Sequence, residues 1–198
     1  MSEPIHLFVS SSPDLQAERE IIGQVVATLP QNVPHLAIGW RIGHTPMPET
    51  EVPLPAPAGD RIVRVEECDL YVLILGHDFA APMGSELRQA TSCGLEPLAF
   101  RKKCTNSPSA QDAIRRLNVE WRVFDTPGQL RQLFTQDLIQ ALIQRATELG
   151  LDLKDLESLM EVDKLIVSQA GKRTEEEAEP HRRDAGRSGV ILGREVWE

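Results

Sequence analysis

The sequence predicts an α/β protein built on a flavodoxin-like parallel sheet of five strands in the order 2-1-3-4-5, with helices on both faces and an extra C-terminal helix. Two observations predict this fold. Short apolar runs alternate with segments of helical periodicity over residues 5–150, a pattern typical of right-handed βαβ units. The third run, residues 69–75, is apolar after its first residue, which indicates a central strand covered on both faces.

Local signals place the individual elements. Ser12 followed by Pro13 is typical of a helix cap and a first helical position, and Asp152 is typical of another cap. Five prolines between residues 45 and 58 exclude a regular helix or a central strand there, so we expect a long loop. The expected strands are residues 5–10, 35–42, 69–75, 96–100 and 120–124, and the expected helices are 13–30, 59–67, 85–93, 109–117, 126–149 and 152–166.

The composition excludes several functional classes. The 198 residues carry a net charge of −9 with a pI near 5.1, which argues against nonspecific binding to nucleic acid or to an anionic membrane. No apolar stretch is long enough to span a bilayer, and the first residues lack the pattern of a signal peptide. Three cysteines without metal-binding spacing predict free thiols in a cytoplasmic protein and no metal site. We also expect no cofactor.

Composition also divides the chain into three parts. Residues 1–150 form the predicted α/β domain, and residues 151–170 form an additional helix. Residues 171–198 begin with a stretch that is dense in charge and poor in apolar groups, as is typical of a linker. They end in the apolar segment 190–197, which is too short for a domain and is either a docking peptide for a partner or the first strand of a further domain.

The predicted strand order places a ligand crevice at the carboxyl ends of the first and third strands. The start of a helix there offers free N–H groups and positive potential, which suits a sugar or a phosphate. Arg19 lies about one turn into the first helix, where it is expected to reach an anion or to pair with an acid near the site. The alternative is that Glu18 and Arg19 form an exposed ion pair of the helix. The candidate binding residues are Ser10, Ser11, Ser12, Gly76, His77, Asp78, Phe79, Ser85 and Arg19.

Glu86 is the candidate catalytic residue. It is expected in the first turn of the helix after the third strand, where the helix dipole favours a carboxylate. That preference is by itself a sufficient reason for an acid at this position, so the alternative is a purely structural role. Ser85 or Gly84 has a similar alternative, because either residue can cap the helix. Asp69 opens the third strand at the opposite edge, so we expect it to be structural.

The motifs around these residues resemble a TIR-like family with the pattern F-[IV]-S-S-T followed by D-L-x-x-E-R, found at the N-terminus of signalling NTPases. This chain has FVSSS at residues 8–12, DLQAERE at 14–20, CDLYVLILG at 68–76, SELRQA at 85–90 and GLEPL at 94–98. The resemblance covers about residues 5–150. In the family pattern two residues separate the serine from the glutamate, whereas here Glu86 directly follows Ser85.

This resemblance implies a function. In TIR domains and nucleoside deoxyribosyltransferases, a glutamate near the start of this helix cleaves or stabilises an N-glycosidic bond, and Glu86 matches it by position. The resemblance therefore implies a signalling or antiviral defence effector that hydrolyses NAD or a related nucleotide, which is then a substrate and not a cofactor. The alternative is a non-catalytic interaction module whose long helices or tail bind a protein partner or a second copy of the chain.

Overall fold

The computed structural model describes residues 4–33, 36–43 and 65–177, with side chains described through residue 166. The chain divides into two compact units, Met1–Asp163 and Lys164–Glu198. The first unit contains the whole sheet and every candidate site residue. The expected loop at 45–58, most of the expected helix at 59–67 and the apolar segment 190–197 lie outside the described residues.

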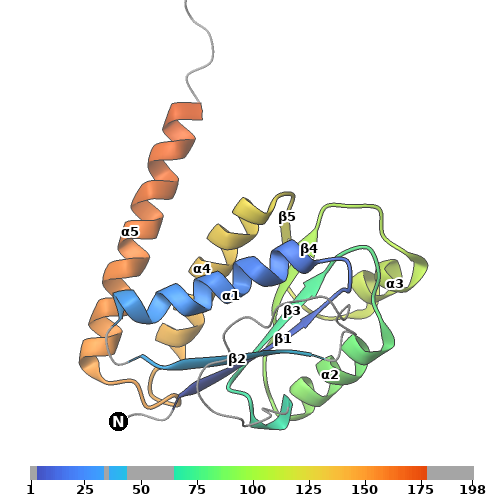
Figure 1. Cartoon of the computed structure of the whole chain (residues 1–198), viewed down its shortest axis with the longest axis horizontal. Coiled ribbons are helices and arrows are strands. Elements are labelled where there is room, and N and C mark those ends of the chain that lie inside the picture. Colours follow the sequence, from blue (N-terminus) through green and yellow to red (C-terminus); the bar gives the residue numbers. More distant parts are fainter. Residues whose placement is uncertain (1–3, 34–35, 44–64, 178–198) are drawn as a thin grey trace, which may run out of the picture. The chain divides into compact units, whose positions relative to one another are not determined.

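The sheet has five parallel strands in the order β2-β1-β3-β4-β5, as the sequence predicts. β1 and β3 are neighbours at its centre, and Phe8 pairs with Tyr71 in their register. The flavodoxin-like α/β fold is therefore confirmed (Figure 1). The strands are β1 (Ile5–Ser11), β2 (Ile38–Ile42), β3 (Leu70–Leu75), β4 (Leu98–Lys102) and β5 (Trp121–Phe124).

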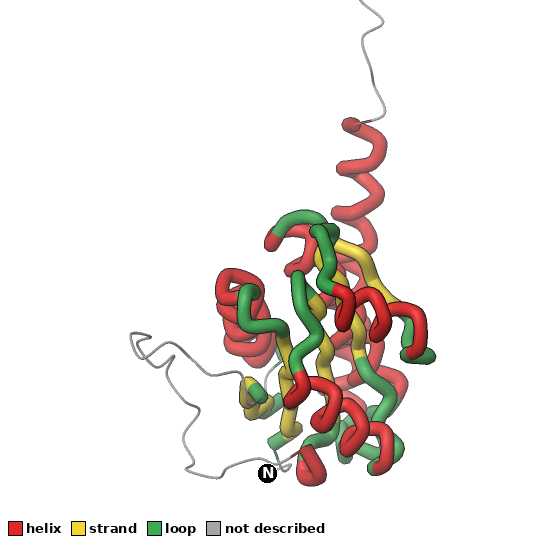
Figure 2. The backbone as a smooth tube through the Cα atoms, turned by 90° about the vertical axis from the view of Figure 1, so that its right-hand side faces the viewer, coloured by secondary structure: helices red, strands yellow, loops and turns green. Residues whose placement is uncertain are grey.

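Helices cover both faces of the sheet, as Figure 2 shows in side view. α1 (Gln16–Asn32) and α4 (Pro127–Gln144) pack on one face, and α2 (Ala81–Ser92) and α3 (Pro108–Arg116) lie on the other. A short 3-10 helix, η1 (Val65–Glu67), precedes β3, and α5 (Leu153–Glu177) is the extra C-terminal helix.

The core lies on both sides of β3, whose six residues are all buried. On the α1/α4 face, the rings of Phe100 and Phe134 meet edge to face with centroids 5.9 Å apart. On the α2 face, Phe8 stacks on Tyr71 at 6.0 Å, and Leu87 of α2 joins the same cluster. The prediction of a strand covered on both faces is confirmed, and the two cores fix β1 and β3 rigidly beneath the candidate site.

Two helices begin elsewhere than expected. α2 begins at Ala81 with Ala80 as its N-cap, so neither Ser85 nor Gly84 caps it, and the expected place of Glu86 in the first turn is wrong. The reason is Pro82, which fits a first turn because its missing N–H would have no partner there. α1 begins later than expected, at Gln16 and not at Pro13.

Other boundaries differ by a few residues. The Ser12 hydroxyl does not cap α1, because it accepts a hydrogen bond from Gly76 N at 2.9 Å and donates to Asp78 O at 2.6 Å. β4 begins at Leu98, two residues later than expected, and β2 begins only at Ile38. The expected cap of α5 is confirmed, since Asp152 accepts from Asp155 N. Thr126 caps α4 in the same way by accepting from Gln129 N.

Candidate functional site

The three serines at the end of β1 point in different directions, because side chains alternate between the faces of a strand. Ser10 faces α2 and donates a hydrogen bond to Glu86. Ser11 faces α1, where it contacts the Arg19 guanidinium at 3.5 Å, and Ser12 reaches across to β3. All three side chains are buried, with exposed fractions of 0–1%. They therefore line the interior and not an open crevice.

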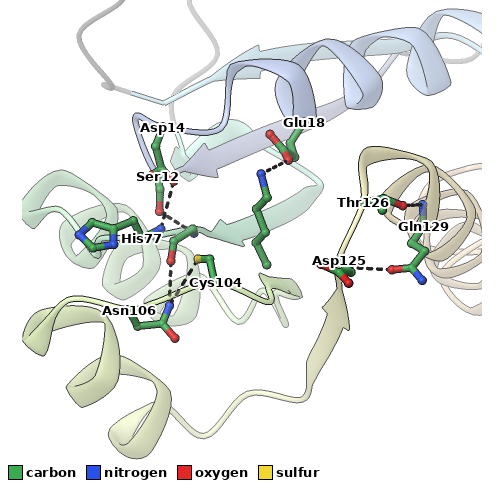
Figure 3. Close-up of polar contacts among 11 residues, drawn as sticks. Ser12, Asp14, Glu18, His77, Cys104, Asn106, Asp125, Thr126 and Gln129 are labelled. Atoms are coloured by element: carbon green, nitrogen blue, oxygen red, sulfur yellow. Dashed lines mark hydrogen bonds and ion pairs between the residues drawn. The ribbon is translucent and has the colours of Figure 1, made fainter.

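The β1–α1 loop lies against the end of β3, and Figure 3 shows Ser12 and Asp14 of this loop beside His77. Gly76 marks how close the approach is: a Cβ there would lie 2.5 Å from Asp14 Oδ2. The backbone of Gly76 is bonded on both sides, since Ser12 Oγ accepts from its N–H and Asn106 Nδ2 donates to its carbonyl at 2.9 Å. His77 N donates to Asp14 Oδ2 at 3.1 Å. These contacts hold the two loops together.

His77 and Asp78 attach the β3–α2 loop to the loop before α3. His77 Nδ1 lies 2.6 Å from the carbonyl oxygen of Thr105. Asp78 Oδ1 accepts from the hydroxyls of Ser107 and Ser109, and these two hydrogen bonds lower the pKa of Asp78 below its usual range. The arrangement places a carboxylate at the N-terminus of α3, where the helix dipole favours it.

An ion pair with a buried carboxylate connects α1 to the end of β4. Glu18 is 2% exposed, and its Oε1 lies 2.8 Å from Lys102 Nζ. The hydrogen bond that Lys102 donates to Glu18 is the main reason why the pKa of Lys102 is raised. Arg19, also buried, donates to the carbonyl oxygens of Ser12 at 3.1 Å and Pro13 at 3.4 Å. The expectation of an exposed Glu18–Arg19 pair is therefore wrong.

We call Ser12, Asp14, Glu18, Arg19 and Lys102 the edge cluster. Lys102 is not among the residues that the sequence predicts for a site. The signal that finds it is strand alternation: Phe100 and Lys102 point to the same face of β4, so Lys102 must meet the α1 side. The edge cluster joins β1, α1, β3 and β4 through its hydrogen bonds and ion pair.

The structure brings Glu86 together with Ser10 from the opposite face of β1. Ser10 Oγ donates to Glu86 Oε2 at 2.6 Å, and Glu86 is only 7% exposed. Gly43, directly after β2, lies against the carboxylate, because a Cβ on Gly43 would be 2.5 Å from Glu86 Oε1. Tyr71 is fully buried beside them: burial raises the pKa of its phenol, the Ser10 hydroxyl lowers it and the Glu86 charge raises it.

We call Ser10, Gly43, Tyr71 and Glu86 the Glu86 cluster. Gly43 and Tyr71 were not predicted, and each has a weak signal in the sequence. Gly43 closes a strand, and Tyr71 is the one hydroxyl-bearing residue in the otherwise aliphatic β3. Chemically, the cluster presents a carboxylate beside hydroxyl donors, with water largely excluded. In such surroundings a carboxylate interacts strongly with a developing positive charge.

The other candidate residues lie apart from this carboxylate. Phe79 packs against the α2-face core, and Ser85 is exposed on α2. A separate cavity of about 550 Å³ lies between α4 and the strand starts of β3 and β4, and it holds none of the predicted residues. Arg122 pairs there with Asp137 at 3.2 Å, and burial raises the pKa of Asp137.

The described residues also bear on metals, thiols and membranes. In this part of the chain no three His, Cys, Asp or Glu side chains come together as metal ligands would. Cys68, Cys93 and Cys104 are free thiols, as predicted, and burial raises the pKa of Cys68 from 9.0 to about 12. Across the described segments, none of the helices combines the length and the apolar character needed to cross a bilayer.

Comparisons with known proteins include a distant structural likeness. No protein-family model matches this chain, and no curated protein matches it. Among solved structures, the chain is similar to a protein described as the glycotransferase of kitacinnamycin, with 17% sequence identity and a TM-score of 0.34. The alignment covers 87% of this chain and 42% of that one, so this chain spans less than half of its length. A likeness of this kind does not determine an activity.

Proposed function

We propose that this chain is a TIR-like effector domain that cleaves the N-glycosidic bond of NAD or a related nucleotide, with Glu86 as the catalytic carboxylate. The single observation that carries the proposal is the contact of 2.6 Å between Ser10 Oγ and Glu86 Oε2. It joins the serine-rich end of β1 to the acid-bearing helix, the two motifs on which the resemblance to this family depends.

The proposed reaction breaks the bond between the anomeric carbon of ribose and the nitrogen of the base. The base leaves with the bonding electron pair, and the sugar passes through an oxocarbenium-like transition state with positive charge on that carbon. The Glu86 carboxylate stabilises this charge, or forms a bond to the carbon that water then hydrolyses. Ser10 keeps the carboxylate oriented by donating its hydroxyl proton to one oxygen.

The surroundings of Glu86 support this role better than a role in helix stability. Glu86 lies in the second turn of α2, beyond the first turn in which the helix dipole acts most strongly. Its side chain is buried, whereas an acid that serves only the dipole stays in water. Burying a carboxylate costs free energy unless a specific set of partners compensates it, and here those partners include Ser10.

The test is release of nicotinamide from NAD by the purified full chain, measured by chromatography. We expect Glu86→Gln, which keeps the shape of the side chain, to lower kcat by about a hundredfold or more, since the charge that stabilises the transition state is lost. The matched control is Glu67→Gln, an exposed acid of η1, which should leave the rate unchanged. Equal rates for wild type and Glu86→Gln would refute the proposal.

Two glycines, Gly39 in β2 and Gly43 directly after it, provide a second test of the proposal. Gly43→Ala places a methyl group 2.5 Å from Glu86 Oε1 and so displaces the carboxylate. We expect cleavage to fall by at least tenfold, because catalysis is sensitive to misplacement on the ångström scale. Gly39→Ala in the same strand meets only His6 Cδ2 at 3.5 Å, an ordinary contact, and is the control.

A second candidate function is assembly, which the exposed apolar residues of α5 favour. Leu153 is 78% exposed and Met160 is 44% exposed, and their spacing of seven residues puts both on one side of the helix. This alternative proposes that α5 pairs with a second copy of the chain. Leu153→Glu with Met160→Glu should then lower the mass measured by light scattering from dimer to monomer, whereas Ser158→Glu should not. An unchanged mass would contradict the proposed pairing.

A further inference from the structure

Tyr71 occupies a position where a phenylalanine would satisfy the packing. Its side chain is completely buried, and its ring stacks on Phe8 with an interplanar angle of 11°. Leu73, Met83 and Leu87 belong to the same apolar cluster. The hydroxyl has no hydrogen-bond partner of good geometry among the described residues. Burying a hydroxyl without a hydrogen-bond partner is unfavourable, so the Tyr71 hydroxyl must have a role other than packing.

The polar groups beside this hydroxyl belong to Ser10 and Glu86. After burial, the Ser10 hydroxyl and the Glu86 charge are the largest influences on the pKa of the Tyr71 phenol, which burial raises. Strand register explains the proximity. Tyr71 pairs with Phe8, and Ser10 is the next residue of β1 on the same face, so the phenol extends along the sheet toward Ser10.

We propose that Tyr71 is the third side chain of the Glu86 site, a positioning residue that acts through Ser10. Ser10 has one hydroxyl proton, which it donates to Glu86 Oε2. Its oxygen can therefore only accept a further hydrogen bond, and the Tyr71 O–H is the buried donor beside it that lacks an acceptor. The order of donation is Tyr71 to Ser10 and Ser10 to Glu86.

This chain of donors explains why Glu86 needs Ser10 in one rotamer. When the Ser10 oxygen accepts a hydrogen bond from Tyr71, the Ser10 hydroxyl stays oriented so that its proton points at the Glu86 carboxylate. Successive hydrogen bonds also polarise one another. Gly43 closes the opposite side, since any side chain there would collide with the carboxylate. Glu86 is thus fixed between a hydroxyl chain and a bare backbone. The inference depends on the proposed function only in that Glu86 acts on a substrate.

Activity measurements test the positioning role. Tyr71→Phe removes only the hydroxyl and keeps the ring on Phe8. We expect kcat for NAD cleavage to fall about fivefold, the effect of one neutral hydrogen bond, with KM within about twofold of wild type. Ser10→Ala should fall at least as far, and the double variant no further than Ser10→Ala alone, because both residues act through one contact. Unchanged kcat in Tyr71→Phe, or additive losses in the double variant, would overturn the proposal.

A spectroscopic readout tests the same contact without activity. Tyr71 is the only tyrosine of the chain, so a ¹³C label at the tyrosine Cζ gives a single NMR signal that responds to hydrogen bonding. We expect Ser10→Ala and Glu86→Gln to shift this signal and Glu67→Gln to leave it in place. A responding signal in an inactive protein would refute the proposed function and keep the Tyr71 contact. If the Tyr71 signal does not shift in Ser10→Ala, the contact between Tyr71 and Ser10 is refuted, whether or not the protein cleaves NAD.

Discussion

The edge cluster and the Glu86 cluster lie on opposite faces of β1 and use similar residue types for different purposes. In the edge cluster the polar groups reach partners on other elements, as when Glu18 meets Lys102 across the sheet. In the Glu86 cluster a carboxylate is buried beside a phenol that lacks a well-formed hydrogen bond. The first arrangement is typical of a scaffold, and the second is typical of a site that meets a ligand. The comparison teaches that alternation along a single strand separates the residues of the scaffold from the residues for which we propose a catalytic role.

Among the variants that test this comparison, we expect Lys102→Met to cause the largest loss in the free energy of unfolding. It leaves the Glu18 carboxylate buried without its cation, which should lower the free energy of unfolding by roughly 2–4 kcal/mol. Urea denaturation measures the change, with Lys103→Met at the exposed neighbouring position as the control. Adding Glu18→Leu to Lys102→Met should recover part of the loss, since the unpaired charge is then gone. If the free energy of unfolding falls no more than in Lys103→Met, the Glu18–Lys102 pair does not stabilise the scaffold.

A smaller effect is expected from Ser12→Ala. The variant removes the acceptor of the buried Gly76 N–H and the donor to Asp78 O, which should lower the free energy of unfolding by about 1–3 kcal/mol. Ser92→Ala, an exposed serine of α2, is the matched control and should change it by less than about 0.5 kcal/mol. If the two variants unfold alike, Ser12 does not tie β1 to β3, and its assignment to the edge cluster fails.

The sequence predicted the strand order because apolar runs and helical periods alternate, and this signal survives errors at element boundaries. It misplaced Glu86 in α2 because Pro82 allows an earlier helix start, which the predicted cap at Ser85 obscured. The pairing of Glu18 with Lys102 could not be predicted from the sequence for a different reason. The partners are far apart in the chain, and their contact depends on which face of β4 Lys102 occupies.

The candidate site was predicted in part for the same physical reasons. The meeting of Ser10 with Glu86 follows from the strand order, which puts the end of β1 next to the helix after β3. An open crevice between β1 and β3 does not follow from it, because the size of the β1–α1 loop decides whether that space is filled. Tyr71 lies at the site because of the register between β1 and β3. This register cannot be predicted from the residue propensities of either strand alone.

The smallest expected effect concerns Asp78 at the border of the edge cluster. Hydrogen bonds from Ser107 and Ser109 lower its pKa from 3.8, so the folded state favours the carboxylate. Its contribution to stability is therefore present above pH 3.8 and is lost as the pH falls through the folded-state pKa. Because Asp78 is only partly buried and water screens its charge, we expect only a few tenths of a kcal/mol, measured as the difference between wild type and Asp78→Ala in urea.

The pH dependence separates this small electrostatic term from packing. The difference between wild type and Asp78→Ala should narrow as the pH falls through the folded-state pKa of Asp78, because the carboxylate is then protonated in both states. Ser109→Ala removes one of the two donors and should weaken that narrowing, because the pKa of Asp78 then lies closer to its usual range. A difference that stays constant with pH would mean that Asp78 supports the loop by packing alone. The link between β3 and α3 would then have no electrostatic part, in contrast to the ion pair of Glu18 and Lys102.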